Sequence, residues 1–231
     1  MLKSATMNRT IPILIFFIFN ALFTFGQDKE LEIIKSSWTS SEGTENEESL
    51  EDWINGEFWG FHSGPIGIPF ASSTLKPQSN NDYKVENIHD LDLTTAWIEG
   101  NEDFGIGESF SIEFSFKEDY EGFGKVYNFY GIIELFNGYC KSEKHWAENS
   151  RIKRLIMFFN EAPVCFIELA DTWQYQTLDL RKFFKEPNYF PNAPFEIKNG
   201  DKLRFEIVEV YKGTKYKDTA LSEFVFQSSG N

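Results

Sequence analysis

An apolar side chain stands at every second position of residues 109–116, SFSIEFSF. Side chains of an extended chain alternate between its two faces, so the three phenylalanines and the isoleucine would share one face, and the serines and Glu113 the other. A helix would spread the same residues around its circumference. The segment therefore predicts a β-strand with one buried face.

Most of the chain after Ala71 consists of similar short stretches, separated by Gly, Asn, Pro and Asp. Turns are predicted at residues 160–163 and 199–201. In residues 203–210 the apolar positions change sides, which predicts a bulge or a strand buried on both faces. Further predicted strands are residues 130–136, 152–159, 164–169, 173–178, 203–210 and 220–226. Short strands without alternating helices predict an all-β fold, a jelly-roll β-sandwich, whose core would take most of the 25 phenylalanines.

The first 26 residues have the pattern of a secretory signal peptide. Lys3 and Arg9 precede an apolar stretch that ends in small residues, so cleavage is expected before Gln27. A transmembrane anchor is the less favoured alternative, because Asn20 interrupts an apolar stretch shorter than the ~20 residues that span a bilayer. The sequence thus predicts a protein that is secreted or extracytoplasmic, with no membrane span after cleavage.

Residues 27–70 are expected to form a short irregular leader, and residues 71–231 the folded domain. The leader contains an acidic run at 42–51, which is typical of a solvated segment. An aromatic cluster follows it, and these side chains either dock on the domain or form exposed binding groups. The cluster is Trp53, Phe58, Trp59 and Phe61.

The chain has a formal net charge of −14, and loss of Lys3 and Arg9 with the signal peptide would make it −16. Such a surface argues against nucleic-acid partners and against attraction to anionic lipid. The two cysteines, Cys140 and Cys165, would reach an oxidising compartment, which permits a disulfide. Cys165 also lies in an alternating apolar stretch typical of a buried thiol, so both alternatives stay open.

Oxygen-bearing side chains are concentrated at residues 90–95, DLDLTT, and another carboxylate follows late in the chain, in residues 218–224, DTALSEF. Hard cations such as Ca²⁺ bind carboxylates, hydroxyls and backbone carbonyls. The same loop also fits a turn in which Asp90 and Thr95 bond backbone amides without a metal. Trp97 follows at the point where the chain re-enters the sandwich, and the core is its favoured place over a ligand-binding face.

Several motifs in the same order resemble a known family. They are ASSTLKPQ (71–78), Tyr83, Asn87, Asp90, Asp92, TTAW (94–97), EG (99–100), GIGE (105–108), NGYCKS (137–142), NSRIKRL (149–155) and VYKGTKYKDTALSEF (210–224). Together they are similar to the discoidin-like (F5/8 type C), galactose-binding domain-like sandwich, and most similar to its NADase-type glycan-binding domain. The resemblance covers about residues 71–227 and implies an eight-stranded jelly roll.

The resemblance also implies one structural cation, Ca²⁺ in type, where the two ends of the domain meet. Its ligands would be Asp90, Asp92, Thr95 and Glu223. The chain departs from the family pattern by placing Leu91 where a glycine often follows the first aspartate. At this position the turn and its cation site can therefore differ from those of the family.

Sugar binding on a sandwich generally needs an aromatic platform and a few planar polar groups on loops. The predicted glycan-binding residues lie in one connection: Tyr139, Lys141, Trp146, Asn149 and Arg151. The alternative is that they pack the loop, with Tyr139 buried and Arg151 paired with an acid. A second polar and aromatic group is Tyr211, Lys215, Tyr216 and Asp218.

Catalytic motifs are absent from the sequence. His62, His89 and His145 lie in no metal-ligand spacing, and the glycines around Ile106 precede a strand rather than the helix that a phosphate site requires. The sequence therefore predicts a secreted non-catalytic carbohydrate-binding module, not an enzyme, with a glycan or glycoconjugate as its partner. The alternatives are a protein-interaction scaffold on the same sandwich and, less favoured, a secreted hydrolase.

Overall fold

The structure is a computed structural model that describes residues 30–38, 67–79, 81–115, 128–185 and 192–229. From Leu31 onward these residues belong to one compact unit. The predicted signal peptide, the acidic run at 42–51, the leader aromatics and His62 lie outside the described residues.

Strands dominate the described chain, and seven of them form one continuous path of hydrogen-bonded neighbours. In spatial order these are β2 (Gly67–Ala71), β4 (Ser109–Phe114), β9 (Lys202–Tyr211), β6 (Ser150–Phe159), β10 (Thr219–Ser229), β5 (Asn128–Asn137) and β8 (Gln176–Asp179). Off this path, β7 (Ala162–Glu168) pairs with β6, β1 (Ile33–Lys35) with β7, and β3 (Trp97–Ile98) with β10. The predicted strands are confirmed to within a few residues at each end.

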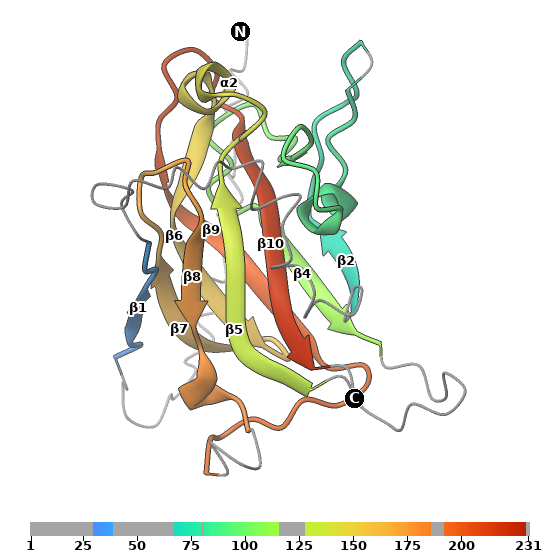
Figure 1. The fold of residues 1–231 in the computed structure, drawn as a ribbon, viewed down its shortest axis with the longest axis vertical. Coiled ribbons are helices and arrows are strands. Elements are labelled where there is room, and N and C mark those ends of the chain that lie inside the picture. Colours follow the sequence, from blue (N-terminus) through green and yellow to red (C-terminus); the bar gives the residue numbers. More distant parts are fainter. Residues whose placement is uncertain (1–29, 39–66, 80, 116–127, 186–191, 230–231) are drawn as a thin grey trace, which may run out of the picture. The chain divides into compact units, whose positions relative to one another are not determined.

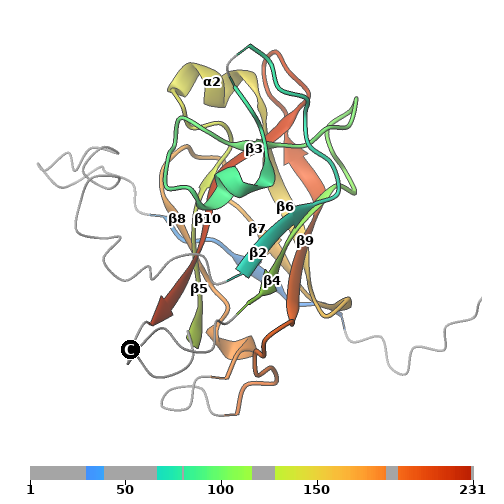
Figure 2. The same cartoon turned by 90° about the vertical axis from the view of Figure 1, so that its right-hand side faces the viewer.

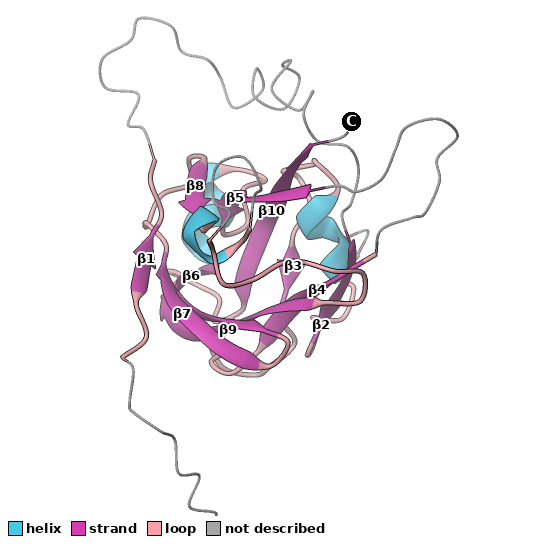
Figure 3. Ribbon diagram, turned by 90° about the horizontal axis from the view of Figure 1, so that it is seen from below, coloured by secondary structure: helices cyan, strands magenta, loops and turns pink. Residues whose placement is uncertain are grey.

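The sheet folds into two layers, as Figure 3 shows from below. Strands β5, β8 and β10 lie in one layer, and β2, β4, β7 and β9 in the other (Figures 1 and 3). The crossing between layers is a short parallel contact of β10 with β6, in which Thr219 and Ala220 pair with Ser150 and Arg151. The arrangement confirms the predicted β-sandwich.

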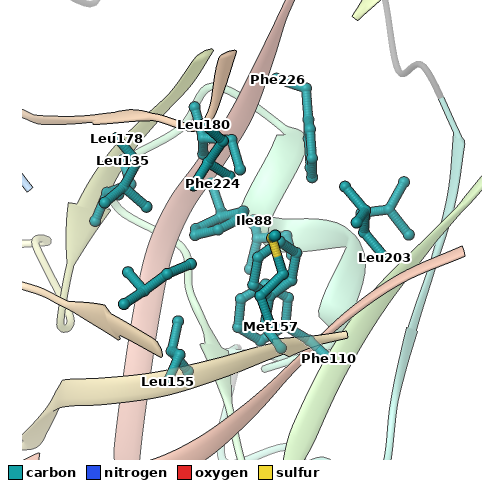
Figure 4. Close-up of a cluster of buried hydrophobic side chains, with 14 of the residues drawn as sticks. Ile88, Phe110, Leu135, Leu155, Met157, Leu178, Leu180, Leu203, Phe224 and Phe226 are labelled. Atoms are coloured by element: carbon teal, nitrogen blue, oxygen red, sulfur yellow. The ribbon is translucent and has the colours of Figure 1, made fainter. Parts of the chain in front are cut away.

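Aromatic side chains from both layers fill the space between them. The rings of Phe110 on β4 and Phe205 on β9 stack with centroids 5.2 Å apart, and Phe224 on β10 meets them at 4.9 and 4.8 Å. Figure 4 shows Phe110 and Phe224 among the aliphatic side chains of the same cluster. Aromatic pairs at these separations add to the free energy gained from burial alone. On β4, Phe110, Ile112 and Phe114 are buried and Glu113 is exposed, as the alternation predicts, but Ser111 on the polar face is also buried, so the strand is covered on both faces near its start.

The predicted bulge in residues 203–210 and the predicted turn that begins at Asn160 are both present. The pairing of β9 with β6 shifts register around Val208, where the apolar positions change sides, so a bulge is present there. Asn160 and Glu161 between β6 and β7 both have positive φ, 48° and 64°, which is the backbone of a tight hairpin turn. Cys140 and Cys165 are both buried and free, so no disulfide joins them.

The leader prediction was wrong where the structure describes it. Residues 33–35 form β1, which runs parallel to β7 and buries Ile34, and Ser37 then bridges to Thr177 of β8. Residues 67–70 belong to β2, which extends the sheet beyond β4. Both segments cover strands whose backbone groups would otherwise lie at an open edge.

Helices are short. The helical segments of the described chain are η2 (Val85–His89), α2 (Glu143–Glu148) and η3 (Arg181–Phe183). None of the helices in these ranges is long and apolar enough to cross a membrane.

Candidate functional site

Three connections meet at one end of the sandwich, which we call the loop end: residues 99–108, 138–149 and 211–218. Figures 1 and 2 show α2 and the β9–β10 connection side by side there. The Thr214 amide and hydroxyl both donate to the Ala147 carbonyl oxygen at 3.0 Å. Lys217 forms an ion pair with Asp103 at 3.0 Å. Hydrogen bonds and ion pairs therefore hold the three connections together.

Side-chain hydrogen bonds fix both ends of helix α2. The Ser142 hydroxyl caps the first turn by accepting from the His145 amide and also contacts His145 Nδ1 at 2.7 Å. At the other end the Asn149 side-chain amide donates to the His145 carbonyl oxygen at 2.8 Å. The pairing of Ser142 with His145 is thus a capping arrangement within one turn, and Asn149 is part of the helix terminus.

Arg151 supports the loop end from beneath. It is 7 % exposed, its guanidinium donates to both carboxylate oxygens of Asp171 at 2.8 to 3.1 Å, and it lies over the Trp146 ring at 4.3 Å. Gly138 makes room for this stack, because a side chain there would begin 2.6 Å from Arg151 and 2.7 Å from Trp146. The alternative reading of Arg151, pairing with an acid, therefore describes its place in the structure.

The other predicted glycan-binding residues divide into buried and accessible ones. Tyr139 is 5 % exposed and packs edge-on against Tyr83, and Asn149 is 6 % exposed. Trp146 is half-buried and donates its indole N–H to the Asn137 carbonyl oxygen at 2.9 Å. Lys141 alone of the five is exposed. The five side chains thus share one region without presenting a common open platform, because all but Lys141 bond or pack within this part of the protein.

Trp97, His89 and the two cysteines are the other residues that could carry chemistry, and most of them have a structural role. Trp97 is fully buried and donates to the Ser73 carbonyl oxygen at 3.0 Å, so its placement in the core is confirmed. Burial lowers the pKa of His89 to about 4, so this imidazole is neutral near pH 7. Burial also raises the pKa of the Cys140 and Cys165 thiols to about 12, which keeps both protonated.

The oxygen-rich loop closes on itself through hydrogen bonds. Asp90 accepts from the Asp92 amide at 3.0 Å and from the Thr95 hydroxyl at 2.8 Å. Asp92 accepts from the amide and the hydroxyl of Thr94 at 2.9 and 2.6 Å. The capped turn that the sequence left open as an alternative to a cation is therefore formed by these residues.

Leu91 stands where the family pattern often has a glycine, and its backbone has the conformation that glycine favours. Its φ is 61°, in the left-handed region that glycine adopts readily and that costs other L residues about 1 kcal/mol or more. The leucine therefore introduces local strain into the turn.

Glu223 of β10 returns to this loop from the far end of the chain. It is 1 % exposed, and neither of its carboxylate oxygens has a hydrogen-bond partner. Burial, followed by the charge of the facing Asp90 carboxylate and its closeness to Glu223, raises the pKa of Glu223 to about 9. The Asp92 carboxylate adds to the repulsion, and the nearby Asp92 backbone amide offsets only part of it. The structure therefore places Glu223 against the Asp90 loop, although no three acid, His or Cys side chains of the described residues are arranged to hold a metal ion.

A neighbouring serine connects this loop to the loop end. The Ser222 hydroxyl donates to the Thr95 carbonyl oxygen and accepts from the Cys140 amide, both at 3.0 Å. The backbone at Thr95 and the start of the 138–149 connection are thus fixed by the same side chain.

Comparison with known proteins identifies the family. Residues 62–227 match the family model described as the NAD glycohydrolase translocation F5/8 type C domain, which is most of the chain. The chain belongs to this family. The resemblance and the fold inferred from the sequence motifs are thereby confirmed.

Solved structures with the same fold come from Clostridium perfringens. The CBM32-1 and CBM32-2 domains of ZmpB match with a TM-score of 0.49 at 9 % identity, over 88 % of this chain and 42 % of that one. Their complex with GalNAc matches with a TM-score of 0.50 at 10 % identity, over 88 % and 41 %. This F5/8 type C domain therefore spans about two fifths of those chains, and at such identity the likeness shows the fold alone. No curated protein matches the sequence.

Sequence reasoning missed one group of residues at the loop end of this F5/8 type C domain. Phe104 lies against two lysines of the β9–β10 connection, with Lys212 Nζ 4.7 Å and Lys217 Nζ 5.8 Å from its ring centroid. The one sign of this group in the sequence is the lysine-rich run at 212–217. Nothing in the sequence places Phe104 beside residues more than a hundred positions away.

Leu91 gives a test of the turn. Leu91→Gly and Leu91→Ala remove the same leucine contacts but differ in the backbone that they favour. We expect Leu91→Gly to be the more stable by about 1 kcal/mol, because alanine is strained at positive φ and glycine is not. Urea denaturation of the two variants measures the difference. Equal stability, or a more stable alanine variant, would contradict the left-handed turn.

Glu223 gives a test by pH. Its pKa is about 9 in the folded protein and near 4.5 in the unfolded chain, so between these values the folded state holds a proton that the unfolded state has lost. Raising the pH through this window therefore lowers the free energy of unfolding, by at most ~1.4 kcal/mol per pH unit. In a chelating buffer, we expect Glu223→Gln to gain stability relative to wild type from pH 5 to pH 9.

Glu113→Gln is the matched control, because Glu113 is an exposed glutamate on β4. Its free energy of unfolding should follow wild type across the same pH range. Parallel curves for wild type and Glu223→Gln would show that Glu223 titrates alike in the folded and unfolded states.

Proposed function

We propose that this F5/8 type C domain is a non-catalytic carbohydrate-binding module that acts outside the cell. The loop end carries the proposal, because three connections bring exposed polar and aromatic side chains onto one surface of a rigid sandwich. Binding residues are concentrated on such loops. The structural neighbour in complex with GalNAc supports a sugar as the ligand class.

Within the loop end, the accessible residues are the ones we assign to the ligand. Lys141 is exposed, Trp146 half-exposed and Tyr216 41 % exposed. We assign Tyr139, Asn149 and Arg151 to the support beneath them, because their polar groups or ring faces are already engaged. An aromatic ring edged by polar groups is the arrangement that sugars bind.

A structural Ca²⁺ at the Asp90 loop is the second part of the proposal. A buried carboxylate without a donor is costly, and facing a second carboxylate increases the cost. A hard divalent cation would neutralise both and accept oxygen ligands from Asp90, Asp92, Thr95 and Glu223. In the described ranges no three acid, His or Cys side chains are already arranged around a metal position, so a cation would have to draw these ligands together on binding. The unpartnered Glu223 is the observation that favours a cation.

The proposal that the domain is non-catalytic rests on the chemistry of its side chains. Both thiols are protonated and buried, and the contact between Ser142 and His145 belongs to a helix cap. The loop end would serve equally well to bind a protein, which is the alternative function. Attachment to surface glycans would bring the domain to a target without chemistry of its own.

A glycan array tests the ligand class. We expect the full chain to bind a subset of glycans in the presence of Ca²⁺, and Tyr216→Ala to weaken that binding about tenfold, because the exposed phenol and the ring that Lys215 lies over are both lost. Lys198→Ala is the control, since Lys198 is exposed outside the loop end. A folded protein that binds no glycan would refute the proposal, and a protein partner whose capture free sugars do not affect would favour the alternative.

Thermal melting tests the cation. A ligand of the folded state at a hundred times its Kd adds ~2.7 kcal/mol, so Ca²⁺ should raise the melting temperature of wild type by roughly 5–10 °C over a chelating buffer. Glu223→Gln should lose most of this shift and Glu113→Gln should keep it. An equal shift in wild type and Glu223→Gln would place the cation elsewhere, and no shift in wild type would mean that hydrogen bonds alone close the loop.

A further inference from the structure

The β9–β10 connection, residues 211–218, places each of its three lysines on an aromatic ring. Lys212 and Lys217 lie over Phe104, at 4.7 and 5.8 Å from the ring centroid, and Lys215 lies 4.7 Å from the centroid of the Tyr216 ring. All three lysines are exposed. We call these five residues the lysine–aromatic surface.

The lysines determine which class of ligand can bind at these rings. A neutral sugar stacks its C–H face on an open aromatic face. Here ammonium groups occupy the faces of Phe104 and Tyr216 and are attracted to them electrostatically. The first groups that an approaching ligand meets on these faces are therefore positively charged, which favours a ligand that carries an acid.

The three ammonium groups are not equally available. Lys217 is paired with Asp103 at 3.0 Å, and Lys215 lies 3.7 Å from Glu148. Lys212 has no acidic partner in the described part of the chain, although the protein has 36 acidic residues for 22 lysines and arginines. An exposed cation left unpaired on an acidic protein is free to bind an external anion without breaking an internal ion pair.

The surface is also held in place before any ligand arrives. The Thr219 hydroxyl donates to the Phe104 carbonyl oxygen at 2.9 Å, and the Gly213 amide donates to the Ser150 hydroxyl at 3.1 Å. Gly213 approaches the end of α2 so closely that a Cβ would lie 2.4 Å from the Glu148 carbonyl oxygen. A fixed connection loses little conformational entropy on binding.

We propose that the lysine–aromatic surface binds an acidic sugar, one that carries a carboxylate or a sulfate, with Lys212 as the main contact of the acid group. This inference rests on the proposed carbohydrate binding and specifies its ligand class. A single acidic sugar suits the surface better than a long polyanion, because the net charge of −14 repels extended negative chains. The body of the sugar would lie toward the exposed Ile106 and the edge of Phe104.

Binding measurements on the full chain test the proposal with three sugars: lactose, 3′-sialyllactose and 3′-sulfolactose. The two acidic sugars distinguish a carboxylate from a sulfate, and lactose is their neutral counterpart. We expect at least one acidic sugar to bind about tenfold more tightly than lactose, the usual gain from a hydrogen bond to a charged group. Lys212→Gln should abolish the preference, and Lys212→Arg should keep most of it.

Lys198→Gln is the matched control, because it removes the same charge from an exposed lysine outside the loop end. Equal loss in both glutamine variants would mean that net charge causes the preference and would overturn the proposal. Comparable binding of a poly-glutamate peptide would show a general anion site and would overturn it as well. Lactose binding as tightly as the acidic sugars would refute the acidic ligand while leaving carbohydrate binding intact. A folded protein that binds no glycan, here or on the array, would refute both.

Discussion

The last strand, β10, holds the two layers of this F5/8 type C domain together. It pairs antiparallel with β5 and β3 and parallel with β6 at Thr219 and Ala220. It also carries Phe224 to the centre of the core and Glu223 to the Asp90 loop. The core, the crossing between layers and the candidate cation site therefore all depend on the register of one strand, in which a shift of one residue would exchange its two faces.

Features that repeat or match a motif were predictable from the sequence. The alternation in residues 109–116 specified β4, and the positions of Asp90, Thr95 and Glu223 in the family pattern specified residues that meet across more than a hundred positions. Strand β1 was not predictable, because three residues carry too little periodicity and their pairing depends on the exposed edge of β7. The partners of Arg151 were not predictable either: the sequence offered pairing with an acid, but only the fold identifies Asp171 and brings Trp146 beside them.

The turn at Asp90 is closed by its own hydrogen bonds and also faces Glu223, the proposed cation ligand from β10. Asp90 and Asp92 already bond the amides and hydroxyls of their own turn, so the turn has internal support. Glu223 does not share in these bonds. The local sequence is thus satisfied by itself, and the long-range contact from β10 adds a buried acid that faces Asp90. A cation bound there would stabilise the contact between β10 and the Asp90 loop, which joins the two ends of the domain. It would not be needed to form the turn.

At the loop end, the residues that support the fold are buried, and the residues that we assign to the ligand are exposed. Arg151, Asn149 and Tyr139 are buried and bonded, so changing them would disturb α2 and the connection that packs on it. Lys212 and Lys215 lie above this layer on a backbone that Gly213 and Thr214 fix to α2. The exposed side chains can therefore be exchanged at little cost to the fold, whereas the buried ones cannot. An arrangement of this kind would let one sandwich change its ligand by substitutions in a single connection. The proposed ligand class therefore follows from the charges on that connection rather than from the more conspicuous aromatic and arginine residues beneath it.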